Sequence, residues 1–227
     1  MRTIVKKIVG PVIQKFHKQW LKKPRRYGYK NISVLVEPGV FPPFLTLSTR
    51  ILLDFINSID ISGRTFLELG CGSGVVSILA AKKGAIVTAS DINQIALDSL
   101  QKNAAGNEVE LTIVYSDLFA NLKNQHFDYI VINPPYYPKN PQSVAEQAWF
   151  CGEKFEYFEM LFGQLRPYLT GETYLILSED CEIESIKSVA AKNKIKFELA
   201  LETKSAGERN FIFRLTLDGL SFTQGSI

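Results

Sequence analysis

The residues best suited to chemistry lie in the stretch INPPYYP, which begins at Ile132. Asn133 ends a run of β-branched and aromatic residues, and Pro134 and Pro135 then restrict φ and lack an N–H. The side-chain oxygen of Asn133 and the carbonyl of Pro134 are therefore two acceptors on a stiff backbone. They match the two donors of an –NH₂ group, and Tyr136 offers a flat face for a planar amide or base. The pattern predicts a site that positions a conjugated amine for attack on an electrophile. The alternative is a rigid turn that only follows a strand.

A glycine-rich stretch, LELGCGSG, is the second chemical feature, with glycines at positions 70, 72 and 74. It separates a predicted strand from a predicted helix. There a backbone without side chains can approach a ligand, and a helix N-terminus offers unpaired N–H groups. Val75 breaks the G-x-G-x-x-G dinucleotide fingerprint, and a P-loop is excluded because no G-K-[ST] follows. The alternative is a glycine turn that serves packing alone.

Two acids end the next two predicted strands. Asp91 follows Gly70 by 21 residues, where a carboxylate can accept hydrogen bonds from both hydroxyls of a ribose. Asp117 ends the third strand and could accept from an adenine amino group. Each acid alone would also suit a helix N-cap. At the ends of three consecutive strands, the glycines and the acids together predict a pocket for an adenosine-bearing cofactor.

The elements that would position these residues alternate between strand and helix from residue 64 onward. Strands are predicted at 64–70, 85–91, 109–117, 127–134, 172–179, 195–202 and 210–217, and helices at 74–84, 93–107, 153–169 and 183–194. This alternation predicts an α/β fold, a Rossmann-like seven-stranded, mostly parallel sheet with helices on both faces. The last two strands, joined by a loop at 203–209, predict a C-terminal antiparallel hairpin with one antiparallel edge strand.

The N-terminal part differs in charge from the rest. Residues 1–30 hold ten of the 26 basic residues and no acid, so the other sixteen face all 23 acids and residues 31–227 sum to −7. An amphipathic helix is expected at 3–21, kinked at Pro11, then a linker at 22–30, a short strand and turn at 31–43 and a helix capped by Thr46 or Ser48. We expect a basic helical extension at 1–30 and a catalytic domain at 31–227. The arm would contact RNA, a ribosome or a membrane surface, or simply pack on its own domain.

Composition bounds the class of protein. The 227 residues are 46% apolar, which suits one α/β domain with a short extension. No apolar run reaches the ~18 residues of a membrane span, and no signal-peptide pattern opens the chain. The three cysteines have neither disulfide nor zinc spacing, so a reducing cytoplasm and no metal site are expected. We expect a monomer or weak dimer.

The motifs LELGCGSG, ASD, YSD and NPPY, in this order, resemble class I S-adenosylmethionine-dependent methyltransferases, and within them the N-P-P-Y branch that methylates amino groups. The resemblance covers about residues 30–218, including the G-V-F turn at 39–41. That branch contains release-factor glutamine, ribosomal-RNA guanine N2, and tRNA and DNA adenine N6 methyltransferases. Residues 1–30 are too few and too basic to be the separate helical N-terminal domain of the bacterial release-factor enzymes, so we expect that domain to be absent.

The resemblance implies a role for each matching residue. The methionine part of S-adenosylmethionine would be held by Glu68, Gly70, Cys71, Gly72, Ser73 and Gly74. Asp91 would bind the ribose, and Ile92, Asp117 and Leu118 would border the adenine. Asn133, also near the cofactor, and the Pro134 carbonyl, stiffened by Pro135, would take the hydrogens of the substrate amine, and Tyr136 would stack on it.

Three functions remain open at this point. The first is methylation of an exocyclic base nitrogen of rRNA or tRNA, favoured by N-P-P-Y, the G-V-F turn and the basic arm. The second is N5-methylation of a glutamine in a release factor, and the third is a non-catalytic, cofactor-binding, RNA-associated protein. A nicotinamide dehydrogenase is disfavoured by Val75 and by the lack of an acid–base residue near the expected crevice.

Overall fold

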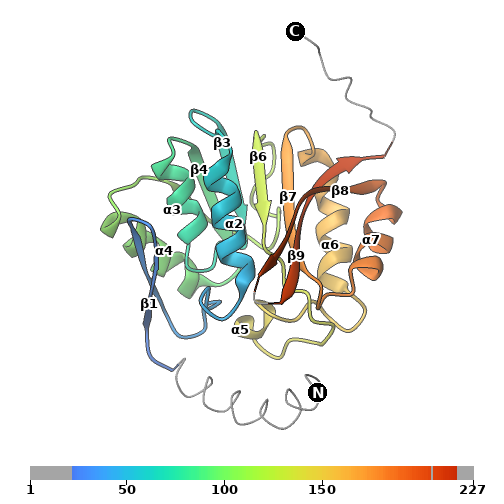
Figure 1. Cartoon of the computed structure of the whole chain (residues 1–227), viewed down its shortest axis with the longest axis horizontal. Helices are drawn as coiled ribbons and strands as arrows, with labels where there is room; N and C mark the ends of the chain where they lie inside the picture. The colour runs from blue at the N-terminus through green and yellow to red at the C-terminus, as the bar shows by residue number, and fades with distance from the viewer. Residues whose placement is uncertain (1–21, 206, 219–227) are drawn as a thin grey trace.

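A seven-stranded sheet forms the centre of the molecule. The computed structural model describes residues 22–205 and 207–218. The strand order is β5-β4-β3-β6-β7-β9-β8 (Figure 1). The strands are β3 (Thr65–Leu69), β4 (Ile86–Asp91), β5 (Thr112–Tyr115), β6 (Tyr129–Ile132), β7 (Glu172–Ser178), β8 (Ile195–Ser205) and β9 (Glu208–Leu217). The first five are parallel and β9 is antiparallel to both its neighbours. The predicted fold class is confirmed.

Helices cover both faces of this sheet. One face carries α2 (Leu47–Ser58), α3 (Val75–Lys82) and α4 (Gln94–Gly106), and the other carries α6 (Glu156–Leu165) and α7 (Ile183–Lys192) (Figure 1). Side chains alternate between the two cores with the period of a strand. Val131 packs with the first group of helices, whereas its neighbours Ile130 and Ile132 pack with the second. This two-sided burial explains the near-continuous apolar runs of the central strands.

A hairpin precedes the sheet, and this corrects the expected linker. β1 (Arg25–Tyr29) pairs antiparallel with β2 (Ile32–Val36), and Tyr29 is only 1% exposed. The hairpin therefore crosses the expected boundary at residue 30 and belongs to the body. Tyr27 and Tyr29 lie on one face of β1, as the period of a strand requires. The basic residues around them made the segment resemble a linker, so this pattern was not recognised as a strand. The expected helix at 3–21 lies outside the described residues.

The C-terminal hairpin is confirmed, but two details of its prediction were wrong. The strands extend to Ser205 and resume at Glu208, so most of the expected loop is strand. The antiparallel strand β9 is also not at the edge, because it pairs with β7 on one side and β8 on the other. The edge strand is β8, which returns to the direction of the parallel strands.

Shorter elements complete the chain. Thr46 occupies the N-cap position of α2 but makes no capping bond, and its hydroxyl lies 3.1 Å from that of Ser48. The helix expected at 153–169 ends earlier and continues as a 3₁₀ turn, η1 (Arg166–Tyr168). A short helix that the sequence did not indicate, α5 (Val144–Gln147), follows β6. None of the described helices is long and apolar enough to cross a membrane.

Candidate active site

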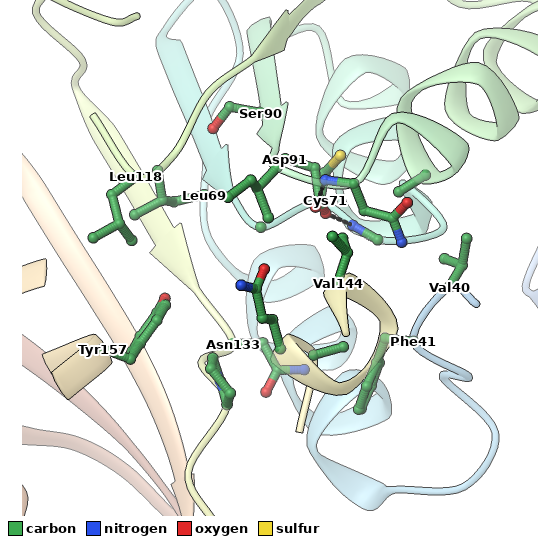
Figure 2. Close-up of a pocket in the computed structure, with 18 of the residues that line it drawn as sticks. Val40, Phe41, Leu69, Cys71, Ser90, Asp91, Leu118, Asn133, Val144 and Tyr157 are labelled. Atoms are coloured by element: carbon green, nitrogen blue, oxygen red, sulfur yellow. Dashed lines mark hydrogen bonds between the residues drawn. The ribbon is translucent and has the colours of Figure 1, made fainter. Parts of the chain in front are cut away.

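A cavity of about 360 Å³ opens at the carboxyl ends of β3, β4 and β6. Its size suits a cofactor or small substrate. In Figure 2, Asp91 and Cys71 lie at the top, Asn133 below them, and Leu118 and Tyr157 to one side. The predicted residues that line it are Glu68, Gly70, Cys71, Gly72, Ser73, Asp91, Ile92, Asp117, Leu118, Asn133 and Pro135. Gly74, Pro134 and Tyr136 are not among the lining residues.

The glycine-rich loop forms one wall of the cavity. The N–H groups of Gly70 and Cys71 donate to the carbonyl of Ser90, at 2.8 and 2.9 Å, and so tie the loop to β4. Gly70 has a φ of +78°, and a Cβ added there would meet nothing within 4 Å. Gly74 differs, because a Cβ there would lie 2.1 Å from Cδ1 of Leu100. Gly74 is therefore needed for the packing of α4 rather than for an approach to a ligand.

Asp91 fixes the glycine-rich loop through hydrogen bonds to backbone N–H groups. Its Oδ2 accepts from the N–H of Gly72 at 2.9 Å, and its Oδ1 accepts from the N–H of Asn93 at 2.8 Å. Burial raises the pKa of Asp91, and these backbone hydrogen bonds oppose that rise. With a further backbone hydrogen bond from Ile92, three of the roughly four acceptor positions of the carboxylate are in use. The side chain can therefore fix the loop and still accept a hydrogen bond from a ligand.

Glu68 is a buried carboxyl in the floor of the cavity, 7% exposed. Its Oε2 accepts from the N–H of Ser77 at 2.8 Å and from the Ser77 hydroxyl. Burial raises the pKa of Glu68 to about 8, the Ser77 hydrogen bonds oppose the rise, and Asp91 adds to it. A cation at this point of the cavity would favour the ionised form.

Asn133 follows β6 and faces the cavity (Figure 2). Its side-chain amide forms no hydrogen bond with another residue of the described part of the chain, so its oxygen is available to a ligand. Pro134 is buried beside it.

Tyr136 occupies a different place from the one its predicted role requires. It is 9% exposed and belongs to the core on the side of α6 and α7, with its ring centroid 4.8 Å from that of Tyr137. Burial raises its pKa. The ring of Tyr136 therefore packs in the core that includes the end of β7, rather than in the cavity. The aromatic side chains that do line the cavity are Phe41, Phe150 and Tyr157.

The comparisons with known proteins agree with this geometry. A family model described as "Methyltransferase small domain" matches residues 31–150, more than half of the chain. The chain belongs to this family. The resemblance to class I S-adenosylmethionine-dependent methyltransferases is confirmed, and with it the predicted cofactor of the family.

Two curated relatives carry names from different substrate classes. A candidate protein N5-glutamine methyltransferase of Methanocaldococcus jannaschii is 38% identical over 110 residues, which are 48% of this chain and 53% of that protein. Ribosomal RNA small subunit methyltransferase C of Actinobacillus pleuropneumoniae is 34% identical over 116 residues, 50% of this chain and 35% of that protein. The chain therefore spans about half of the first relative's length and about a third of the second's.

Solved structures share the fold. A methyltransferase from Pyrococcus furiosus superposes with a TM-score of 0.62 at 19% identity, covering 92% of this chain and 98% of that one. The 16S rRNA N2 G1207 methyltransferase of T. thermophilus, solved with AdoMet and guanosine, gives 0.59 at 21% identity, covering 84% and 50%.

The cavity of this family member fits S-adenosylmethionine. The open space above Gly70 leaves room for a ligand against the backbone, and the buried Ser90 hydroxyl in the wall has no hydrogen-bond partner in the described residues. Leu118 adopts a φ of +48°, and its carbonyl accepts from the Ser116 hydroxyl at 2.7 Å. Such backbone strain is typical of ligand-binding positions.

The charged residues that line the cavity also suit S-adenosylmethionine. Within the described part of the chain, the charged lining residues are all acidic, namely Glu68, Asp91, Asp117 and Glu156. S-adenosylmethionine carries positive charge on its sulfur and its amino group, which this lining would attract.

Two segments far apart in sequence cover the cavity. The turn at 39–41 is held by the side-chain amide of Asn93, which donates to the Gly39 carbonyl at 2.8 Å. Phe41 then meets Trp149 with ring centroids 4.8 Å apart. The loop that carries Trp149 is braced by a bridge between Tyr137 and Phe150. The prediction noted the G-V-F turn but not this contact, which no local pattern signals.

Proposed function

We propose that this chain transfers a methyl group from S-adenosylmethionine to a conjugated amino group. The observation that carries the proposal is the amide of Asn133, which has no hydrogen-bond partner among the described residues and faces a cavity whose opposite wall is the glycine-rich loop and Asp91. When bound, S-adenosylmethionine supplies a methyl group on a positively charged sulfur.

The chain's own contribution is to position and shield. The Asn133 oxygen and the Pro134 carbonyl are proposed to accept the two hydrogens of the incoming –NH₂, which orients its nitrogen toward the cofactor side. Asp91 would hold the ribose of the cofactor by hydrogen bonds, and Glu68 would hold its methionine part by hydrogen bonds and charge. Phe41, which lines the cavity and packs against Trp149, would exclude water. Among the described lining residues there is no histidine or lysine to act as a general base. Orientation of the amine is the contribution proposed for Asn133.

The proposed acceptor is an exocyclic base nitrogen of rRNA or tRNA. The 34% identity to ribosomal RNA methyltransferases and the basic N-terminal residues support this choice. The second candidate is a glutamine side chain of a release factor, favoured by the 38% identity to the candidate glutamine methyltransferase. Both acceptors are planar and carry a conjugated –NH₂, so the same pair of acceptors suits either.

Radiolabelled methyl transfer by Asn133→Ala tests the proposal. We expect cofactor binding within about twofold of the wild type and a loss of transfer of about 100-fold, because only the orientation of the amine changes. Asn121→Ala is the matched control, since Asn121 lies outside the cavity and its amide bonds the Tyr115 carbonyl. Total RNA and purified release factor are offered as separate acceptors. Equal transfer by the wild type and Asn133→Ala would contradict the role of Asn133, and no transfer to either acceptor would contradict the function.

A further inference from the structure

The β1–β2 hairpin presents an unusual concentration of positive charge. Between residues 22 and 36 there are five basic residues and no acid. Lys22, Lys23, Arg26 and Lys30 are exposed and form no ion pair with an acid in the described ranges. Arg26 lies in β1, and the three lysines flank that strand. Among the described residues, β1 pairs with β2 alone.

The hairpin is nevertheless firmly fixed to the body. Its apolar face is buried, with Val34 at 0% and Ile32 at 2% exposure. Asn103 of α4 accepts from the N–H of Leu35 at 2.8 Å and donates to its carbonyl at 2.9 Å. One helical turn later, Asn107 accepts from the N–H of Ser33 at 3.2 Å and donates to its carbonyl at 2.8 Å. The two asparagines thus occupy the inner edge of β2, and the basic outer strand is a rigid platform.

This platform is joined directly to the cavity. The chain that leaves β2 forms the turn carrying Val40 and Phe41, which border the cavity in Figure 2. Asn103 also donates to the Ser73 carbonyl of the glycine-rich loop at 3.1 Å. A polymer lying along β1 would therefore be close to the opening.

The charges of the two surfaces are complementary to different parts of a nucleotide. The charged residues that line the cavity in the described part of the chain are all acidic, so the cavity repels phosphate but accepts a neutral base. The cationic strand outside it attracts phosphate. We propose that β1 and the lysines before it bind the phosphodiester backbone of an RNA whose target base enters the cavity. This inference rests on the proposed function and assigns its substrate to RNA.

The test measures binding of a mixed-sequence, single-stranded RNA of about 20 nucleotides to the full chain by fluorescence anisotropy, between about 0.05 and 0.3 M salt. The hairpin variant carries Lys23→Gln, Arg26→Gln and Lys30→Gln. The matched control carries Lys82→Gln, Lys123→Gln and Lys194→Gln. These three exposed lysines precede β4, β6 and β8 in the chain, near the amino ends of those strands, whereas the cavity opens at the carboxyl ends.

Each phosphate contact to a single strand contributes about 0.7 to the salt slope, so removing three should lower the slope by about 2. At about 0.1 M salt this corresponds to about 100-fold weaker binding by the hairpin variant, with the control variant unchanged. Equal RNA binding by the hairpin variant and the wild type would overturn the inference. It would also be overturned if the hairpin variant lost affinity for release factor while keeping its affinity for RNA.

Calorimetry with S-adenosylhomocysteine measures cofactor binding independently of RNA binding. It therefore distinguishes a failure of the RNA proposal from a failure of the proposed function. We expect equal cofactor affinity in the wild type and both triple variants, because none of the six residues lines the cavity. Absence of cofactor binding by the wild type would contradict the proposed function, whereas the RNA measurement alone decides the role of the hairpin.

Discussion

Glu68→Gln should change how the stability of the protein depends on pH. Burial raises the pKa of Glu68 from 4.5 to about 8 in the folded chain. The folded state therefore holds a proton that the unfolded chain releases near pH 4.5. Between these two values the native state binds more protons than the unfolded state, so the free energy of unfolding falls as pH rises. The stabilisation is complete below about pH 4.5 and is lost by about pH 8.

The size of the effect follows from the two pKa values. At about 1.36 kcal/mol per pH unit, the interval from 4.5 to about 8 corresponds to a limit of about 5 kcal/mol. The substituted amide would not titrate, while its side-chain oxygen could still accept from Ser77. Between about pH 5 and pH 9, the wild type should therefore lose several kcal/mol of stability relative to Glu68→Gln. Burial also raises the pKa of Asp91. Because Asp91 is present in both the wild type and Glu68→Gln, its effect on stability largely cancels in the comparison.

Urea denaturation at about pH 5, 7 and 9, at constant ionic strength, measures this difference. Glu153→Gln is the control, because it removes the charge of an exposed carboxylate outside the cavity. Saturating S-adenosylhomocysteine adds a second comparison. Its amino group should favour ionised Glu68 and move the pH window of the wild type downward. If the stability curves of wild type and Glu68→Gln run parallel over this whole pH range, the buried carboxyl does not hold the proton and the reasoning is wrong.

Two substitutions test the packing around the cavity. Gly74→Ala should lower the free energy of unfolding by about 2–3 kcal/mol, because the added Cβ would overlap Leu100. The control is Gly63→Ala, at a similar φ of +70° but in open space, which should lower the free energy of unfolding by about 1 kcal/mol. Urea denaturation compares the two variants. Asn103→Leu and Asn107→Leu each remove two hydrogen bonds to β2, but only Asn103 also holds the glycine-rich loop. Calorimetry should show about tenfold weaker cofactor binding for Asn103→Leu alone. Equal cofactor affinities would show that the loop does not depend on this contact.

Much of the sheet and of the cofactor side of the cavity was predictable from local patterns. The carboxyl ends of parallel strands meet at one edge of a sheet, so residues that end consecutive strands gather there whatever the details of packing. Asp91 and Asn133 follow this rule, and both line the cavity. The near-continuous apolar runs of the central strands could be recognised without knowledge of their partners, because each of these strands is buried on both faces.

The parts that could not be predicted depend on contacts between distant segments. The position of Tyr136 is decided by the core beside the end of β7, which offers its ring a buried place that the N-P-P-Y pattern does not encode. The contact between Phe41 and Trp149 joins a turn before the sheet to a loop after β6. The strand β1 was concealed because its outward residues are basic, and charge is a poor guide to whether a segment pairs.

The position of β9 between β7 and β8 has a consequence for how the protein is made. During synthesis β8 emerges before β9, which is its neighbour in the sheet as far as the described residues show, so β8 cannot join the sheet until β9 has left the ribosome. All residues that line the cavity precede Met160 or include it, and so emerge well before then. A nascent chain that stops short of Glu208 would carry every residue that lines the cavity. It would leave the edge of β7 open and would lack the side chains that β9 adds to both cores. Completion of the sheet thus waits for residues 208–217, and products terminated before these residues would be exposed to proteolysis.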